Sequence, residues 1–200
     1  MTGLRRLSLA VLLSGSGRTL ENLLNQIAAG KLAASVAVVV TSRADVRGVR
    51  IAERAGVPVR VLPPPAGSAI EAWSDQVFQA CSQAAVDLVV MAGFLHLVRI
   101  PRAFVGRVIN IHPSLLPAFG GRGFHGMNVH RAVLERGCTV SGCTVHLVDD
   151  EYDHGRILLQ KTVPVLPDDS PESLAARVFA AECETLPEAI ARLGIPRLGG

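Results

Sequence analysis

The stretch LSLAVLLSGSGRTLENLL, residues 7–24, decides the fold class of this 200-residue chain. Its first part, Leu7–Leu13, is an apolar run that ends in the glycine-containing turn SGSG. Leucines at positions 20, 23 and 24 then recur at the spacing of an amphipathic helix. A strand that passes through a tight turn into a helix is the first half of a strand–helix–strand unit.

The same alternation continues along the chain. Further strands are expected at 36–40, 57–62, 86–91 and 105–111, followed by a pair of strands at 143–148 and 157–163. Helices are expected at 19–29, 44–55, 69–84, 127–136 and from 170 to about 192, the last with Ser170 as N-cap and Pro171 at its first position. This pattern predicts an α/β fold with a doubly wound, mostly parallel sheet, in a single domain over residues 1–200. The tail at about 194–200 is expected to be flexible.

Composition and charge narrow the possible partners. The chain is 49% hydrophobic and 18% charged, which is typical of a packed globular protein. The net charge of +3 comes from scattered arginines, so we expect small-molecule substrates and neither nucleic acid nor membrane as a partner. The apolar run at 7–13 is too short for a signal peptide, which predicts a cytoplasmic protein. The four cysteines lack metal-ligand spacing and are expected to be reduced thiols.

Ligands of doubly wound sheets bind beyond the carboxyl ends of the strands. That rule marks SGSGRT after the first strand, AGFLHLV after the fourth and NIHPS after the fifth. In the first segment, Gly15 and Gly17 permit a tight turn, and the helix N-terminus that follows suits a phosphate group. The segment is neither a dinucleotide fingerprint, because Leu20 replaces the third glycine, nor a P-loop. An ordinary turn without a ligand is the alternative.

The segment VINIHPSLLP, residues 108–117, places polar side chains at the end of a buried strand. Asn110 and His112 are two residues apart, so their side chains face the same side of the strand. Pro113 restricts His112 to an extended backbone. An amide can donate to an oxygen that becomes negative in a transition state, and a histidine can transfer protons near neutral pH. These residue types therefore predict a catalytic pair, the alternative being side chains that only cap backbone groups.

A carboxylate beside His112 would favour the charged imidazole. The loop VDDEYDHG offers three candidates, of which Asp150 is the first choice and Asp149 and Asp153 are competitors. The remaining histidines have no partner at metal-ligand spacing, and those of the loop at 117–130 are expected on the polar surface. A serine hydrolase is excluded because the chain has no Gly-x-Ser-x-Gly motif.

Four segments together carry a family resemblance: VVMAGFLHLV, INIHPSLLPAF, GCTVHLVDDEYDHGRILLQ and SPESLAARV. From Leu7 to about Leu193 the chain resembles the phosphoribosylglycinamide formyltransferases, a family with a Rossmann-like formyltransferase fold. The resemblance implies an enzyme of de novo purine biosynthesis that transfers a formyl group. The donor would be 10-formyltetrahydrofolate, as cosubstrate, and the acceptor would be the amine of glycinamide ribonucleotide.

The resemblance also implies residue roles. The N-terminal half would bind the ribonucleotide, and the C-terminal half would bind folate and carry out catalysis. The implied catalytic residues are Asn110, His112 and Asp150. The implied ribonucleotide-binding residues are Gly17, Arg18, Thr19 and Glu182. The implied folate-binding residues are Leu95, His96, Leu97, Val98 and Asn110. No metal is expected, and the protein would be a monomer or a homodimer.

Three other functions remain open. The same catalytic set serves 10-formyltetrahydrofolate hydrolases, in which water replaces the amine, but that family carries an additional N-terminal domain. Methionyl-tRNA formyltransferases carry an additional C-terminal domain that binds nucleic acid. A non-enzymatic nucleotide-binding module would not need Asn110, His112 and a loop carboxylate together. We therefore expect the transferase, with the hydrolase as the first alternative.

Overall fold

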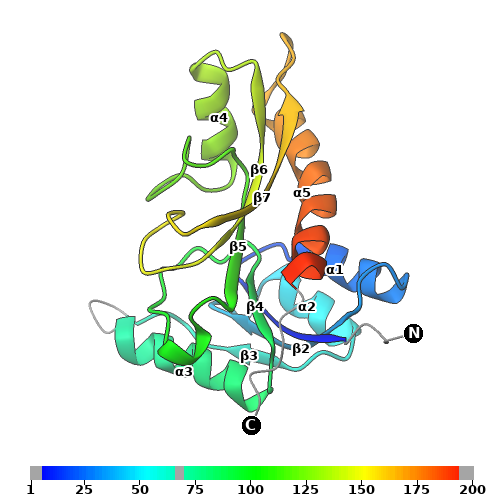
Figure 1. The fold of residues 1–200 in the computed structure, drawn as a ribbon, viewed down its shortest axis with the longest axis vertical. Coiled ribbons are helices and arrows are strands. Elements are labelled where there is room, and N and C mark those ends of the chain that lie inside the picture. The colour runs from blue at the N-terminus through cyan, green and yellow to red at the C-terminus, as the bar shows by residue number, and fades with distance from the viewer. Residues whose placement is uncertain (1–5, 66–69, 194–200) are drawn as a thin grey trace. The chain divides into compact units, whose positions relative to one another are not determined.

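The computed structural model describes residues 6–65 and 70–193 (Figure 1). The strands form one seven-stranded sheet in the order β3-β2-β1-β4-β5-β6-β7. This confirms the predicted α/β class with a mostly parallel sheet. The chain divides into two compact units, the first ending at Ile109 and including the end of the last helix from Ala191, and the second spanning Asn110–Ile190. The predicted flexible tail lies outside the described residues.

Up to β5, the described residues of unit 1 form strands, α-helices and one short 3-10 helix. Their bounds are β1 (Leu7–Leu13), α1 (Arg18–Ala28), β2 (Ala34–Thr41), α2 (Arg47–Arg54), β3 (Val59–Val61), α3 (Ile70–Gln83), β4 (Leu88–Met91) and η1 (Arg102–Phe104). Strand β1 pairs in parallel with β2 on one side and β4 on the other, and β2 pairs in parallel with β3. Because β1 is central, its apolar side chains are almost all buried, as the run at 7–13 predicts.

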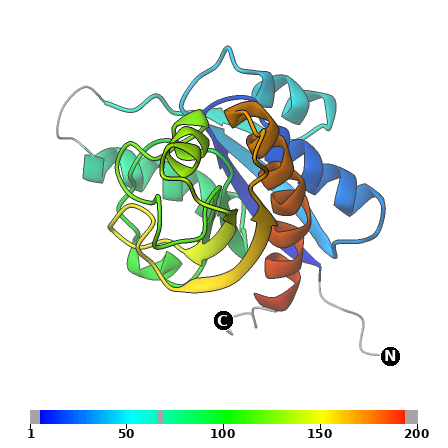
Figure 2. The ribbon, with the colours of Figure 1, turned by 90° about the horizontal axis from the view of Figure 1, so that it is seen from above.

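Helices cover both faces of the sheet in unit 1. Figure 2 shows α1 and α2 on one face and α3 on the other. This arrangement follows from the strand order, because right-handed crossovers place the helices on opposite faces when the direction of strand addition reverses. The carboxyl ends of β1 and β4 consequently lie at one edge of unit 1, and the turns SGSGRT and AGFLHLV begin there.

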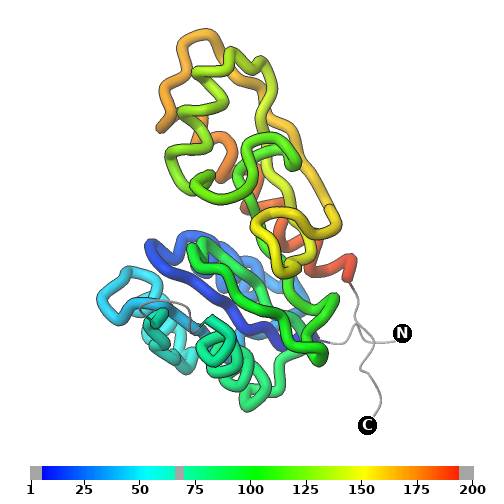
Figure 3. The backbone as a smooth tube through the Cα atoms, turned by 90° about the vertical axis from the view of Figure 1, so that its left-hand side faces the viewer, coloured from blue at the N-terminus to red at the C-terminus, as the bar shows by residue number. Residues whose placement is uncertain are grey.

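Unit 2 begins within β5 (Val108–His112) and contains α4 (Met127–Glu135), β6 (Val140–Leu147), β7 (Ile157–Pro164) and most of α5 (Pro171–Leu193). Strands β6 and β7 are antiparallel, with Val140 opposite Pro164 and His146 opposite Ile157. The tube in Figure 3 follows the chain through the loops that join these elements. Side chains of α4, β6, β7 and α5 share one core cluster: Val133, Cys143, Val163, Leu174, Val178 and Ala181.

Two further predictions can be compared with the structure. Helix α5 begins at Pro171, and Ser170 caps it, because the hydroxyl of Ser170 accepts a hydrogen bond from the N–H of Ser173 at 3.2 Å. Cys81 and Cys143 are buried, and Cys138 and Cys183 are partly buried. Burial raises the pKa of Cys81 to about 12, so this thiol is unreactive at neutral pH. Among the helices that the structure describes, none is both long and apolar enough to cross a membrane.

Candidate active site

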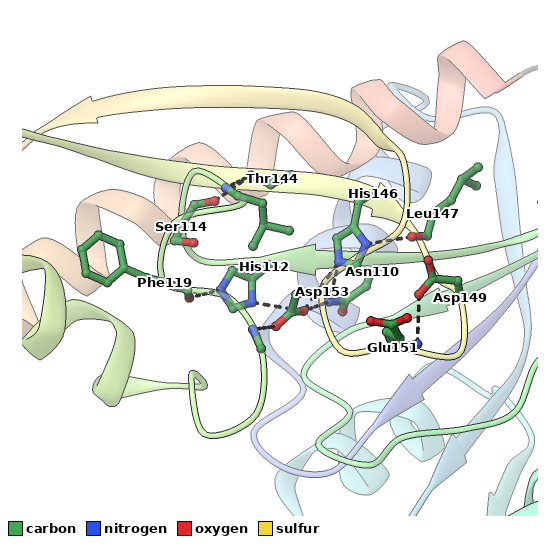
Figure 4. A network of polar contacts seen from close by, with 12 residues as sticks. Asn110, His112, Ser114, Phe119, Thr144, His146, Leu147, Asp149, Glu151 and Asp153 are labelled. Carbon is green, nitrogen blue, oxygen red and sulfur yellow. Dashed lines mark hydrogen bonds and ion pairs between the residues drawn. The ribbon is translucent and has the colours of Figure 1, made fainter.

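The end of β5 carries the predicted pair on one face. Ile109 and Ile111 are buried in the core, while Asn110 and His112 point to the other side, where both contact the carboxylate of Asp153 (Figure 4). The Nδ2 atom of Asn110 lies 3.4 Å from Oδ1 of Asp153, and Nδ1 of His112 lies 3.4 Å from the same oxygen. The spacing of two residues along an extended chain thus brings the amide and the imidazole together, as predicted.

The partner carboxylate is Asp153, which corrects the prediction of Asp150. Asp150 is exposed in the loop between β6 and β7, whereas the side chain of Asp153 is 11% exposed. The direction of the loop explains the difference. A Cβ atom at Gly155 would lie 1.9 Å from the carbonyl oxygen of Leu147, so the loop folds directly back onto the end of β6. Asp153 has a positive φ of 54° at this bend. A role for Asp150 remains a prediction.

The environment of Asp153 stabilises its charged form. Burial by itself would raise the pKa of this carboxyl, but the neighbouring rings of His112 and His146 hold the pKa well below its usual range. The N–H of Gly121 adds to the effect by donating to Oδ2 at 2.9 Å. Asp153 is therefore a carboxylate at every physiological pH.

The two ring nitrogens of His112 both face hydrogen-bond acceptors. Its Nδ1 faces the carboxylate of Asp153, and its Nε2 lies 2.8 Å from the carbonyl oxygen of Phe119. Neither partner can donate a hydrogen bond, so a ring that carries a proton on both nitrogens would satisfy both contacts. The side chain is 5% exposed, and the carboxylate of Asp153 provides a counterion for that charged form.

His146, at the end of β6, is the fourth member of this cluster, and the sequence analysis did not select it. Its Nδ1 lies 2.8 Å from the carbonyl oxygen of Leu147, which makes Nδ1 the donor. In the neutral ring Nε2 is then an acceptor, and Nδ2 of Asn110 donates to it at 3.1 Å. His146 therefore fixes the orientation of the Asn110 amide. The sequence feature that could have indicated His146 is its place just before an acidic loop, on the same face of the strand as Thr144.

The glycine-rich loop after β5 closes around this cluster from the other side. The carbonyl of Phe119 and the N–H of Gly121 bind His112 and Asp153 as described above, and a Cβ atom at Gly120 would lie 3.3 Å from Cβ of Asp153. The loop backbone thus contacts both charged members of the cluster.

His130 corrects a second expectation. It was expected on the polar surface, but it lies on α4 and is 4% exposed. Burial, followed by the charge of His112, lowers the pKa of His130, so its ring is neutral at neutral pH. The amphipathic spacing with Val129 and Val133 explains the burial, because these residues form the inner face of the helix.

The predicted phosphate-binding turn lies in unit 1. Gly17 is the N-cap of α1 with φ 70° and ψ 17°, a left-handed conformation that favours glycine. Arg18 and Thr19 begin the helix, and Arg18 is exposed. The first N–H groups of a helix lack acceptors within it, so this turn can present them to an anion. The ribonucleotide role of these residues remains a prediction.

The predicted folate segment follows β4 in unit 1. Leu95 is 52% exposed, whereas Val98 is buried. The ring of His96 lies edge-on to Trp73 and Phe94, with centroid distances of 5.7 and 5.6 Å, and burial lowers its pKa. The segment therefore presents a neutral aromatic group and an exposed apolar side chain. Its folate role, including that of Leu97, remains a prediction.

Glu182 lies on α5 in unit 2 and is partly buried. Its charge acts together with burial to raise the pKa of the neighbouring Cys143 thiol. The predicted contact of Glu182 with the ribonucleotide is not tested by this arrangement.

An amide donor, an imidazolium and a carboxylate at the strand ends of an α/β fold are typical of enzymes that transfer or hydrolyse acyl groups. Comparison with known proteins makes the class specific. The chain belongs to the formyl transferase family, whose model matches residues 7–190.

Two relatives that are both named phosphoribosylglycinamide formyltransferase support this membership. The chain is 40% identical over 191 residues to the chloroplastic phosphoribosylglycinamide formyltransferase of Vigna unguiculata, covering 94% of this chain and 61% of that protein. It thus spans about three fifths of the plant protein. It is 34% identical over 181 residues to the phosphoribosylglycinamide formyltransferase of Haemophilus influenzae, covering 90% of this chain and 83% of the relative.

Solved structures agree with the fold. Glycinamide ribonucleotide transformylase 1 of Symbiobacterium toebii superposes with a TM-score of 0.85 at 41% identity, over 94% of this chain and 88% of that one. The phosphoribosylglycinamide formyltransferase of Brucella melitensis superposes with a TM-score of 0.83 at 34% identity, over 98% and 100% of the two chains.

Proposed function

We propose that this protein transfers the formyl group of 10-formyltetrahydrofolate to the amine of glycinamide ribonucleotide. The products are formylglycinamide ribonucleotide and tetrahydrofolate, in de novo purine biosynthesis. The observation that carries the proposal is the placement of the His112 ring, whose two nitrogens face the carboxylate of Asp153 and the carbonyl of Phe119. Family membership and the names of the relatives support the choice of substrates.

The chemistry requires an oxyanion donor and an acid. Attack of the amine nitrogen on the formyl carbon turns the carbonyl oxygen into an oxyanion. Asn110 stabilises it through the N–H whose contact with Asp153 is long, at 3.4 Å, while its other N–H stays on His146. The imidazolium of His112 adds a positive charge beside the same atoms.

Collapse of this intermediate breaks the bond between the formyl carbon and N10 of the folate. His112 donates one proton to the departing nitrogen, and the proton lost by the attacking amine restores the imidazolium. Asp153, rather than Asp150, keeps that proton available as the counterion of His112. No metal takes part in this scheme.

The remaining predicted contacts complete the proposal. Gly17, Arg18 and Thr19 would bind the ribonucleotide phosphate, and Glu182 would contact the same substrate. The folate would lie along the segment of Leu95, His96, Leu97 and Val98, with its formyl group at Asn110.

Formyl transfer measured with and without glycinamide ribonucleotide tests the proposal. We expect release of tetrahydrofolate only when the amine is present, and a loss of about 10²–10³-fold in kcat for Asn110→Ala. A loss of about 10²–10⁴-fold is expected for His112→Ala. Equal folate release without the amine would instead identify a hydrolase, and wild-type rates in both variants would refute the mechanism.

A further inference from the structure

The turn that precedes α1 rests directly on the start of α2. The N–H of Gly48 donates to the carbonyl of Gly15 at 3.1 Å. A Cβ atom at Gly17 would lie 2.5 Å from Cα of Gly48, so no side chain fits between the two backbones. The shape of the turn therefore depends on how the first residues of α2 are placed.

Arg47, the first residue of α2, binds this turn through its side chain. Its Nη1 donates to the carbonyl of Ser16 at 3.2 Å. Its Nη2 lies 2.9 and 2.7 Å from the two carboxylate oxygens of Glu21 in the first turn of α1. One guanidinium thus joins the peptide before Gly17 to the helix after it.

The contact between Arg47 and the Ser16 carbonyl also orients the N–H of the next residue, because the peptide bond is planar. In a trans peptide the carbonyl oxygen and the N–H lie on opposite sides, so the direction of the Ser16 carbonyl fixes the direction of the Gly17 N–H. Holding the carbonyl on Arg47 turns the N–H of Gly17 the other way. It also keeps the negative end of this peptide away from any anion bound at the turn.

We propose that Arg47 is a positioning residue for the phosphate-binding turn, acting through the carbonyl of Ser16. The proposal rests on the function proposed above, in which this turn binds the ribonucleotide phosphate. Glycine-rich turns depend on backbone placement for anion binding, since their N–H groups are the donors. Arg47 supplies that placement from a different strand–helix unit.

A purely electrostatic effect of Arg47 on anion binding is the alternative to the positioning role, and an experiment can distinguish the two. Glu21 places a negative charge one turn into α1, and Arg47 could assist anion binding only by neutralising it. The double variant Glu21→Gln/Arg47→Met removes both charges and leaves the Ser16 carbonyl unbound. If neutralisation is the whole effect, this variant regains the affinity of the wild type.

Steady-state kinetics of the full chain test the proposal. We expect Arg47→Met to raise KM for glycinamide ribonucleotide roughly three- to tenfold, the range for a charged hydrogen bond discounted for exposure. The kcat and the KM for 10-formyltetrahydrofolate should change by less than about twofold, because these belong to other residues. The double variant should keep the raised KM. Arg54→Met, an equal loss of charge at the exposed end of the same helix, should match the wild type.

The kinetic results distinguish a failure of the Arg47 proposal from a failure of the proposed function. A wild-type protein without amine-dependent transfer would refute that function. If the wild type transfers the formyl group but Arg47→Met keeps the wild-type KM for the ribonucleotide, only the role of Arg47 is refuted. That role is also refuted if the double variant Glu21→Gln/Arg47→Met regains the wild-type KM. Arg47→Lys, which keeps the charge but cannot bind both partners through a fork, provides a second variant and should also raise KM.

Discussion

Replacing Asp153 by asparagine tests the central geometry of the candidate active site. One carboxylate oxygen faces Asn110, His112 and His146, and the other accepts the N–H of Gly121 at 2.9 Å. Asn110 and Gly121 approach this carboxylate as hydrogen-bond donors, and Nδ1 of His112 faces it at 3.4 Å. An asparagine offers one oxygen and one N–H₂ group, so one side of the cluster would meet a donor instead of an acceptor.

The magnitude follows from the charge of His112. Without its counterion the nearly buried imidazolium loses its stabilisation, so the acid required for collapse of the intermediate is depleted. We expect Asp153→Asn to lower kcat by about 10²–10⁴-fold. The folding cost is expected to be about 1–3 kcal/mol, the range for an unsatisfied buried group. That corresponds to a fall in Tm of roughly 2–4 °C per kcal/mol.

The assay compares Asp153→Asn with Asp150→Asn, which makes the same chemical change three residues earlier on an exposed carboxylate. Formyl transfer at saturating substrates gives kcat, and thermal denaturation shows that both variants are folded at the assay temperature. Asp150→Asn is expected to stay within a few-fold of the wild type. A large loss in Asp150→Asn together with an active Asp153→Asn would refute the assignment and restore the prediction made from the sequence.

Three other predictions concern the loop glycines, His146 and the ion pair of Asp169 with Arg177. Gly121 and Gly123 both have a φ of 93° and open space around the position of a Cβ atom, so Gly121→Ala and Gly123→Ala should cost similar stability. Only the backbone N–H of Gly121 donates to Asp153. We therefore expect kcat to fall further in Gly121→Ala than in Gly123→Ala. His146→Leu removes the acceptor that orients the catalytic amide, and steady-state kinetics should show kcat lowered by roughly tenfold or more, short of the 10²–10³ for removing the donor itself. Asp169 accepts hydrogen bonds from Arg177 at 2.6 and 2.9 Å, which hold its pKa well below the usual range. Its stabilisation is thus complete above the unfolded pKa of about 4 and is lost as pH falls below it, so thermal denaturation of Asp169→Asn should show a Tm deficit at pH 7 that narrows below pH 4.

The fold could be predicted because its elements carry local signals. The apolar run at 7–13 coincides with β1, since a strand with neighbours on both sides must be apolar on both faces. Helix ends were predicted to within a few residues where glycine or a serine–proline pair marks them, as at the start of α5. Strand β6 begins at Val140, three residues before its predicted start, because Ser141 and Gly142 interrupt the apolar signal on which the prediction relied.

The site was predictable only where side chains follow a regular backbone. Asn110 and His112 share a face because a strand alternates, and that rule needs no tertiary information. The loop that carries the carboxylate has no such period. The direction of the loop depends on the close approach of Gly155 to Leu147 and on the positive φ of Asp153. Neither feature can be predicted from residue propensities or from the spacing of residues in the sequence. The three aspartates of the loop were therefore all candidates in the sequence, and only Asp153 faces His112 in the structure.

The clustering of the side chains proposed as catalytic bears on how the enzyme would select an amine over water. The amide, the imidazolium and the carboxylate all belong to unit 2, and their charges would assist attack by an amine or by water equally well. The proposed phosphate turn belongs to unit 1. On this proposal, substitutions in the catalytic cluster should appear in kcat, and substitutions at the turn should appear in KM for the ribonucleotide. Preference for the amine over water then comes from binding the ribonucleotide, which raises the local concentration of the amine, and not from the chemistry of the cluster.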